Sequence, residues 1–187
     1  MDFLIAKATD GLRGLDKQWL NTLALMLALG ADAPAFTAYG VLEANEDPVA
    51  QGIHFATTVK DAPLVFAPAL DFELAHNETG VAALHAARMW VETVEQALGR
   101  SAMVYTSPSF VETLEKYAGD AADEDLGVLG DHALWVAHYG VLIPRVPPPW
   151  VDYAIHQRGP KGATLPGTKT PVDVDVFRGA PADLLAL

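Results

Sequence analysis

The chain has 187 residues, of which 51% are hydrophobic and 19% are charged. It is therefore long enough and apolar enough to form one globular domain with a sizeable core. Its net charge of −12 argues against non-specific nucleic-acid binding and against anionic membrane surfaces, and it suits a neutral or polar substrate. The absence of cysteine excludes disulfides and thiolate metal sites.

Apolar runs with strand character alternate with helical patterns along most of the chain. Strands are expected over residues 3–9, 36–42, 67–74, 102–106, 134–139, 153–157 and 172–177. Helices are expected over residues 16–29, 47–59, 79–98 and 109–117, and the acidic stretch 119–130 is expected to be a solvated loop. Such alternation indicates an α/β fold with parallel strands joined by crossovers, except for the last two strands, which a loop connects.

The predicted strand at residues 67–74 ends in two carboxylates, Asp71 and Glu73, on either side of Phe72. On a strand the two acids point to the same side, about 6.6 Å apart, and Phe72 points the other way. Their mutual repulsion tends to raise the pKa of one carboxyl while the other stays ionised. The pair can thus supply a general acid and an ionised partner. The alternative interpretation is a strand end with two solvated acids.

Further polar side chains lie in or near the distal halves of the other predicted strands. These are Lys7, Tyr39, Tyr105, His138, Gln157 and Asp173. In a (β/α) barrel the catalytic residues come from several strand ends at one face, whereas core packing alone needs no polar residue there. A barrel is therefore favoured over an open sheet. The six histidines show no metal-ligand spacing, so no metal site is expected.

Six short segments carry a resemblance to a known family. They are residues 5–11 (IAKATDG), 47–51 (DPVAQ), 70–73 (LDFE), 104–107 (VYTS), 134–139 (LWVAHY) and 172–177 (VDVDVF). In this order they resemble the family 25 glycoside hydrolases, which are N-acetylmuramidase lysozymes and include many bacteriophage endolysins. The resemblance covers nearly the whole chain. It implies one catalytic domain over residues 1–187, built as a modified β/α barrel of seven or eight strands.

The resemblance also implies a reaction and a set of roles. The reaction is hydrolysis of the β-1,4 bond between N-acetylmuramic acid and N-acetylglucosamine in peptidoglycan, without a cofactor. Glu73 resembles the general acid, Asp71 its ionised neighbour, and Asp173 the acid on the last strand, with Asp175 as second choice for that last role. The residues implied to contact the sugars are Lys7, Tyr39, Tyr105, Trp135, Gln157 and Asp175. The nucleophile is either the substrate's N-acetyl group or a carboxylate.

Plain structural interpretations stand beside these roles. Lys7 is equally well explained as an ion-pair partner of the acids. Tyr39 and Tyr105 fit barrel packing with a solvated hydroxyl as well as sugar contact. Trp135 fits the core, since it lies within a predicted strand, and Asp173 fits a salt bridge or a turn contact.

Two departures from the family pattern are visible. Family members begin with a further strand that carries an acidic residue in a Gly-x-Asp-x-Ser-like pattern, whereas this chain starts at Met1, directly at the match to the second strand. The family's Tyr-His pair on the third strand is Tyr39-Gly40 here. A barrel of seven strands would leave two strand edges unpaired, which a homodimer could cover. Both a monomer and a homodimer are therefore considered.

Three functional hypotheses follow. The leading one is a muramidase acting on the glycan strands of peptidoglycan, with no membrane or nucleic-acid partner. Because no secretory signal opens the chain, such a protein is expected to accumulate in the host bacterial cytoplasm before it reaches the wall. The second is a catalytically weakened relative that binds glycan or serves a structural role. The third is a β/α glycosidase for another polysaccharide, such as a chitin-type polymer.

Overall fold

A computed structural model describes residues 2–119, 123–160, 162 and 171–187. One eight-stranded sheet has the order β2-β1-β3-β4-β5-β6-β7-β8. The strands are β1 (Phe3–Asp10), β2 (Gly14–Leu15), β3 (Ala35–Val41), β4 (Ala69–Asp71), β5 (Met103–Thr106), β6 (Ala133–Ala137), β7 (Ile155–Gly159) and β8 (Val174–Phe177). The helices are α1 (Trp19–Leu29), η1 (Gly30–Asp32), α2 (Pro48–Val59), α3 (Gly80–Leu98), α4 (Pro108–Ala118), α5 (Asp123–Gly130) and α6 (Pro181–Leu184).

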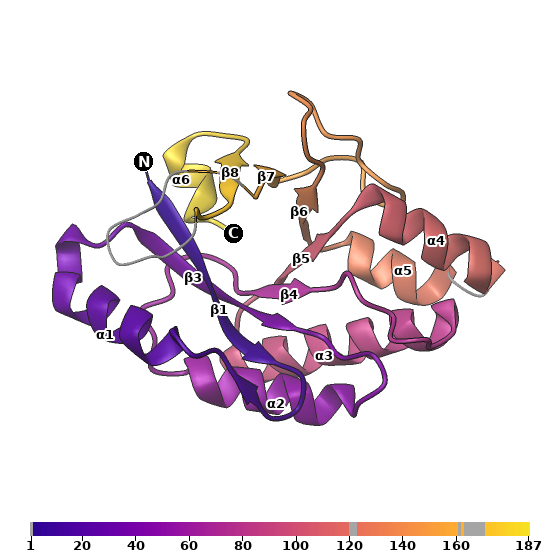
Figure 1. Cartoon of the computed structure of the whole chain (residues 1–187), viewed down its shortest axis with the longest axis horizontal. Helices are drawn as coiled ribbons and strands as arrows, with labels where there is room; N and C mark the ends of the chain where they lie inside the picture. The colour runs from indigo at the N-terminus through magenta and orange to yellow at the C-terminus, as the bar shows by residue number, and fades with distance from the viewer. Residues whose placement is uncertain (1, 120–122, 161, 163–170) are drawn as a thin grey trace.

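The sheet is a curled half-barrel. The strands β1, β3, β4, β5, β6 and β7 run parallel, while the short β2 and the final β8 are antiparallel to β1 and β7. No pairing joins β8 to β1 within the described ranges. Figure 1 shows α2 and α3 along the convex side of the sheet, with α1 near one end and α4 and α5 near the other. The predicted α/β fold is confirmed, with eight strands and an open side.

Three helices begin at residues whose side chains cap the first turn. The Asp47 carboxylate accepts the N–H of Ala50 at 3.1 Å, and the hydroxyls of Thr79 and Ser107 cap α3 and α4 in the same way. Such caps satisfy donors that the first helical turn leaves without a partner. The helix α3 ends at Gly99, whose φ of 66° is in the left-handed region. The positions where these helices begin and end determine where the neighbouring strands end.

Alternation along the strands divides the buried side chains into two clusters. One cluster lies between the sheet and the helices and contains Leu70 and Phe72. The other lies on the inner face of the sheet and contains Ala69, Tyr105 and Trp135. Because side chains at i and i+2 of a strand share a face, Asp71 follows Ala69 onto the inner face. The concave side of the half-barrel therefore receives the polar ends of the strands.

The acidic stretch 119–130 differs from the prediction. Residues 123–130 form the helix α5, in which Leu126 and Leu129 are buried. The carboxylate of Asp125 is also buried and is bound by the guanidinium of Arg88 on α3. Residues 120–122 lie outside the described part of the chain. The prediction of a solvated loop was wrong because the density of acids obscured the i, i+3 spacing of the two leucines, which is a helical signal.

Gly40 on β3 lies in a tightly packed part of the core. A Cβ at this position would come 2.8 Å from Phe55 Cδ2, 2.8 Å from Thr9 Oγ1 and 3.0 Å from Trp90 Cζ2. These contacts are shorter than van der Waals separation, so neighbouring side chains would have to move. The histidine that the family pattern has here would meet Phe55 and Trp90, and these two rings account for the glycine in this chain.

We expect Gly40→Ala to lower the free energy of unfolding by about 1–3 kcal/mol, which urea denaturation at neutral pH would measure. The matched control is Gly127→Ala on α5, where an added Cβ meets nothing within 4 Å. Alanine is better than glycine inside a helix, so this control should leave stability unchanged or raise it by about 0.5–1 kcal/mol. Equal effects of the two substitutions would contradict the packing account of Gly40.

Candidate active site

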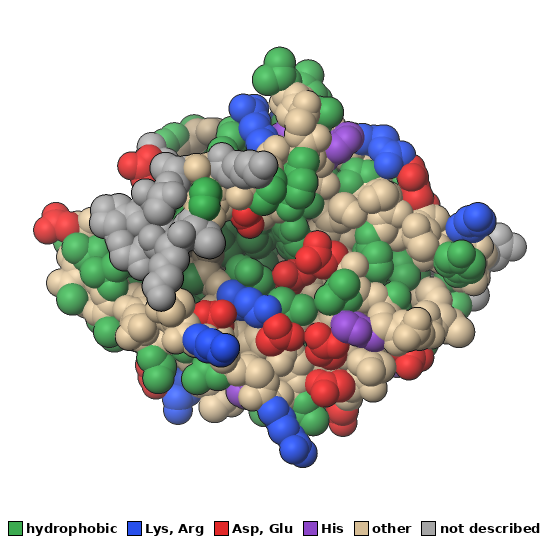
Figure 2. Space-filling view, in the orientation of Figure 1, with side chains coloured by type: hydrophobic (Ala, Val, Ile, Leu, Met, Phe, Trp, Pro, Cys, Tyr) green, Lys and Arg blue, Asp and Glu red, His purple; other side chains and the backbone are tan. Residues whose placement is uncertain are grey.

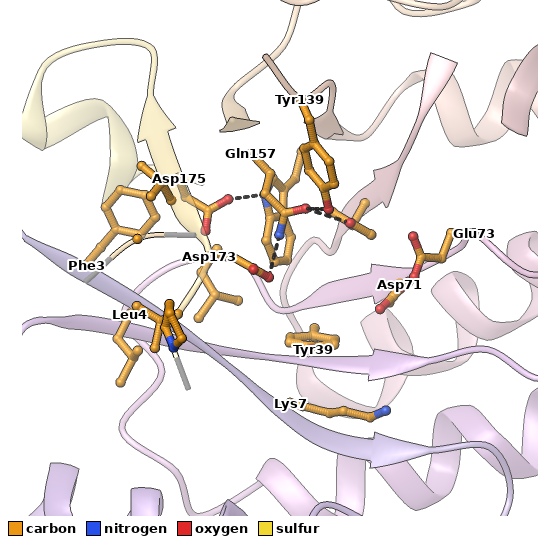
Figure 3. A pocket seen from close by; sticks show the side chains of 17 residues that line it. Phe3, Leu4, Lys7, Tyr39, Asp71, Glu73, Tyr139, Gln157, Asp173 and Asp175 are labelled. Carbon is orange, nitrogen blue, oxygen red and sulfur yellow. Dashed lines mark hydrogen bonds between the residues drawn. The ribbon is translucent and has the colours of Figure 1, made fainter. Parts of the chain in front are cut away.

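A cavity of about 600 Å³ opens on the concave side of the sheet. Figure 2 shows it as a hollow in the middle of the visible face, and Figure 3 shows the side chains that line it. All nine residues that the sequence proposed for the site line this cavity: Lys7, Tyr39, Asp71, Glu73, Tyr105, Trp135, Gln157, Asp173 and Asp175. The structure thus confirms that they gather in one place, while their individual roles stay predictions.

Asp71 and Glu73 differ sharply in their surroundings. Asp71 ends β4 and is only 7% exposed, with Oδ1 buried and without a hydrogen-bond partner among the described residues. Glu73 lies two residues further on and is exposed. Phe72 between them points to the other side of the sheet and packs edge-on against Phe110, with ring centroids 5.0 Å apart. This contact anchors the strand end and keeps both carboxyls directed toward the cavity (Figure 3).

The pKa of Asp71 is raised to about 8, chiefly by burial and then by the negative charge of Glu73, while the ammonium of Lys7 partly opposes the rise. Asp71 therefore holds a proton at neutral pH in the free protein. The assignment of Glu73 as the acid and Asp71 as its ionised neighbour stays a prediction, and it requires this proton to move when substrate binds.

The loop that carries Glu73 away from β4 is held in an unusual conformation. Both His76 and Asn77 have positive φ, at 49° and 66°, which costs about 1–3 kcal/mol for each non-glycine residue unless the surroundings compensate. His76 Nε2 lies 2.7 Å from Glu43 Oε2, in the loop after β3. This contact ties the two loops together beside the acid pair.

Lys7 forms its ion pair with Asp10, three residues along the same chain segment. Its ammonium also lowers the pKa of Asp71 electrostatically. The expected ion pair of Lys7 with the acids of the site is absent among the described residues, where Lys7 pairs with Asp10 instead. Because Lys7 also lines the cavity, a contact with substrate stays a prediction.

A hydrogen-bond network forms the wall opposite the acid pair. Gln157 Oε1 accepts from the hydroxyls of Tyr105 at 2.8 Å and Tyr139 at 2.7 Å. Its Nε2 donates to Asp173 Oδ2 at 3.1 Å. Since the amide oxygen faces two donors and the nitrogen faces a carboxylate, the orientation of the amide is determined by its partners. Gln157 therefore holds Asp173 at the cavity surface (Figure 3).

Tyr139 is a site residue that sequence reasoning did not propose. It is 50% exposed and lies two residues beyond Ala137, the last residue of β6. The available signal was alternation, because Trp135 and Ala137 lie on the inner face and Tyr139 has the same parity. The hydrophobic residues Phe3, Leu4 and Val172 also line the cavity and were not proposed. They come from the start of β1 and from just before β8, on the open side of the half-barrel.

His138, which was expected on the same face, lies elsewhere. Its side chain lines a neighbouring cavity, and its Nδ1 accepts the backbone N–H of Arg145 at 2.9 Å. Because Trp135 and Ala137 lie on the inner face, alternation directs His138 to the opposite side, and the expectation of a shared face was wrong.

Trp135 both packs in the core and makes a polar contact. It is only 4% exposed and packs against Tyr105 and Tyr39, with ring centroids 4.5 and 5.9 Å away. Its Nε1 donates to Asp175 Oδ1 at 2.7 Å. Burial raises the pKa of Asp175 to about 6, the Trp135 hydrogen bond opposes that rise, and the charge of Asp173 adds to it.

We expect Trp135→Phe to raise the pKa of Asp175 above about 6, because the substitution removes the donor that favours the ionised form. The measurement is an NMR titration of the Asp175 carboxyl. Trp150→Phe serves as the control, since Trp150 Nε1 donates to the His132 carbonyl instead. An unchanged or lowered pKa in Trp135→Phe would contradict this assignment.

Within the described residues, no group of three or more His, Asp or Glu side chains is placed to hold a metal ion. Over the same part of the chain, no helix combines the length and the apolar character needed to cross a membrane.

The sequence matches the family described as "Glycosyl hydrolases family 25" over residues 1–164. Among solved structures, the fold is similar to a bacterial lysozyme from Streptomyces coelicolor, with a TM-score of 0.80, 21% identity, and coverage of 100% of this chain and 85% of that chain. It is also similar to a family 25 lysozyme from Aspergillus fumigatus, with a TM-score of 0.75, 19% identity, and coverage of 98% and 86%.

The spore cortex lytic enzyme from Clostridium perfringens has a TM-score of 0.78 and 22% identity, with coverage of 98% of this chain and 62% of that chain. No curated protein matches the sequence significantly.

Proposed function

Because the chain belongs to family 25 of the glycosyl hydrolases, and is thus a glycoside hydrolase, we propose that it cleaves the β-1,4 bond between N-acetylmuramic acid and N-acetylglucosamine in peptidoglycan. The observation that carries this proposal is the pairing of buried Asp71 with exposed Glu73 at one side of an open, aromatic-walled cavity. Asp173 and Asp175 add carboxyls on the opposite wall. The cavity is large enough for sugar rings.

Cleavage of a glycosidic bond needs a protonated carboxyl beside the leaving oxygen and negative charge beside the oxocarbenium-like centre. Glu73 is the carboxyl that a leaving oxygen can reach, because it is exposed at the cavity surface. With a sugar bound, the donor role requires a proton on Glu73. The proton that Asp71 holds in the free protein then moves to Glu73, and the Asp71 carboxylate that remains faces the developing positive charge.

After this proton transfer, Glu73 and Asp71 act one after the other. Glu73 donates to the leaving oxygen, and ionised Asp71 stabilises the sugar cation or orients the N-acetyl group that attacks it. Asp173, held by the Gln157 amide at 3.1 Å, adds a second negative charge from the far wall. The ring of Tyr39, with Trp135 packed against it, supplies apolar surface against which a sugar ring can pack.

The test is to compare sugar release from purified peptidoglycan and from chitin oligomers under the same conditions. We expect soluble reducing sugar from peptidoglycan and little from chitin. Release from chitin alone would indicate a glycosidase for another polysaccharide. No release from either substrate, with retained binding to peptidoglycan, would indicate a glycan-binding relative without turnover.

A further inference from the structure

A second cavity, of about 350 Å³, lies next to the first. We call it the side cavity. Its polar lining consists of Glu73, Ser107, Ser109, His138, Tyr139 and Arg145. Glu73 and Tyr139 line both cavities, so the two spaces meet at the proposed acid. A substrate held in the first cavity by Asp71 and Asp173 would extend past Glu73 into the side cavity on the leaving-group side.

Arg145 gives the side cavity a positive charge. It belongs to the segment that follows β6, which projects from the molecule in Figure 1. Its guanidinium pairs with Glu112, and the two side chains are 51% and 50% exposed. An ion pair between two half-exposed groups is worth little, and a guanidinium has five N–H donors, so Arg145 keeps donors for a ligand.

His138 provides a second donor of defined position. Its Nδ1 accepts the backbone N–H of Arg145 at 2.9 Å, so neutral His138 must carry its proton on Nε2. Its backbone is held as well, because its carbonyl accepts from His156 Nε2 at 2.8 Å and its N–H donates to the Gln157 carbonyl at 3.2 Å. The His138 ring is thus held against the backbone of Arg145, and both residues line the side cavity.

This donor-rich lining contrasts with the rest of the molecule, which has a net charge of −12. Among the described residues, the first cavity is lined by four carboxyls and by the ammonium of Lys7. A neutral sugar has no need of a cation, but the peptide branches of peptidoglycan carry carboxylates. A guanidinium and an imidazole N–H together match the acceptors of a carboxylate.

We propose that the side cavity binds a carboxylate of the peptide branch on the N-acetylmuramic acid that follows the leaving N-acetylglucosamine, with Arg145 as its cation and His138 as a second donor. This inference rests on the proposed function, since it takes the substrate to be peptidoglycan and the leaving side to lie beyond Glu73. Arg145 would then determine a preference for glycan that still bears its acidic peptides.

The test measures binding to protein carrying Glu73→Gln, so that the substrate is not consumed. The probes are a soluble peptidoglycan tetrasaccharide with its peptides, the same tetrasaccharide after removal of the peptides, and the peptide-bearing form with its carboxylates amidated. We expect Arg145→Gln to weaken binding of the first probe about ten-fold, because a hydrogen-bonded charge is lost. Binding of the other two probes should not change.

Arg178→Gln is the matched control. Arg178 is 52% exposed and pairs with a carboxylate that is 55% exposed, Asp152, so the change in charge and in pairing is the same, but Arg178 does not line the side cavity. It should leave binding of all three probes unchanged. Thermal unfolding of both variants would show that each remains folded.

Equal weakening for all three probes would mean that Arg145 contacts sugar, and no weakening for the first would mean that it contacts nothing; either result overturns the inference. Failure of every probe to bind before the Arg145 change also overturns it. The proposed function fails separately, if protein with Glu73 intact binds the probes and does not cleave them. Cleavage without a difference between the probes would overturn only the inference about Arg145.

Discussion

Glu73→Gln is expected to lower kcat on peptidoglycan by about 10²–10⁴-fold, because the amide keeps the shape of the side chain and cannot donate the proton. The loss should appear in kcat more than in KM, since the exposed side chain can still contact the sugar. The measurement is the initial rate of reducing-sugar release at saturating substrate.

The matched control is Glu78→Gln, which changes an exposed glutamate in the same loop after β4. It should leave kcat within about two-fold, as surface substitutions away from a site usually do. If Glu73→Gln retained kcat to the same degree, Glu73 would not be the acid. Asp71, which already holds a proton in the free protein, would then become the candidate donor.

Asp71→Asn is expected to raise stability at high pH and to lower activity. The pKa of Asp71 is raised from 3.8 to about 8 in the folded protein. Between these values the folded state keeps a proton that the unfolded state has lost, so stability falls as pH rises through this window. A tenfold change in a proton-binding constant corresponds to about 1.4 kcal/mol, so the penalty on wild-type stability above pH 8 is on the order of several kcal/mol.

The asparagine cannot ionise, so it removes this penalty. We expect Asp71→Asn to match wild type in urea denaturation near pH 4 and to exceed it by a few kcal/mol, in order of magnitude, near pH 9. Its activity should fall sharply, because the carboxylate that faces the sugar cation is lost. Asp61→Asn, at an exposed position, is the control and should show no such pH-dependent gain. A variant less stable than wild type at pH 9 would contradict the raised pKa.

The acid pair was predictable from local sequence because two-residue alternation is the strongest geometric rule of a strand. Asp71, Phe72 and Glu73 follow it, with the phenylalanine in the layer between sheet and helices and both carboxyls at the cavity. Likewise, Trp135 and Tyr105 occupy the inner face that alternation predicts. Alternation does not predict how deeply a side chain is buried. Asp71 is buried and Glu73 is exposed, although they are only two residues apart.

Other features depended on contacts that sequence reasoning could not see. Tyr139 and His138 lie beyond the end of β6, where Tyr139 meets Gln157 and His138 meets the backbone of Arg145. The helix α5 was missed because acids dominate its composition and only two leucines mark its buried side. The tyrosine and the histidine are positioned by long-range hydrogen bonds, and α5 is stabilised by packing from another part of the chain.

The role of Gly40 shows how a departure from a family pattern can be explained by packing. The absent histidine could be taken as a sign of weakened catalysis. In the structure, Phe55, Trp90 and Thr9 already occupy the space into which a side chain at this position would project. The departure is therefore accounted for by the core of this chain, and it carries no separate argument against turnover.

The most direct test of the central claim is the identity of the sugar at the new reducing end after digestion of purified peptidoglycan, determined by borohydride reduction and analysis of the sugar alcohols. We expect the alcohol of N-acetylmuramic acid with the wild-type protein and none above background with Glu73→Gln. The alcohol of N-acetylglucosamine in place of it would show that the other glycosidic bond is cleaved, and would contradict the proposed reaction.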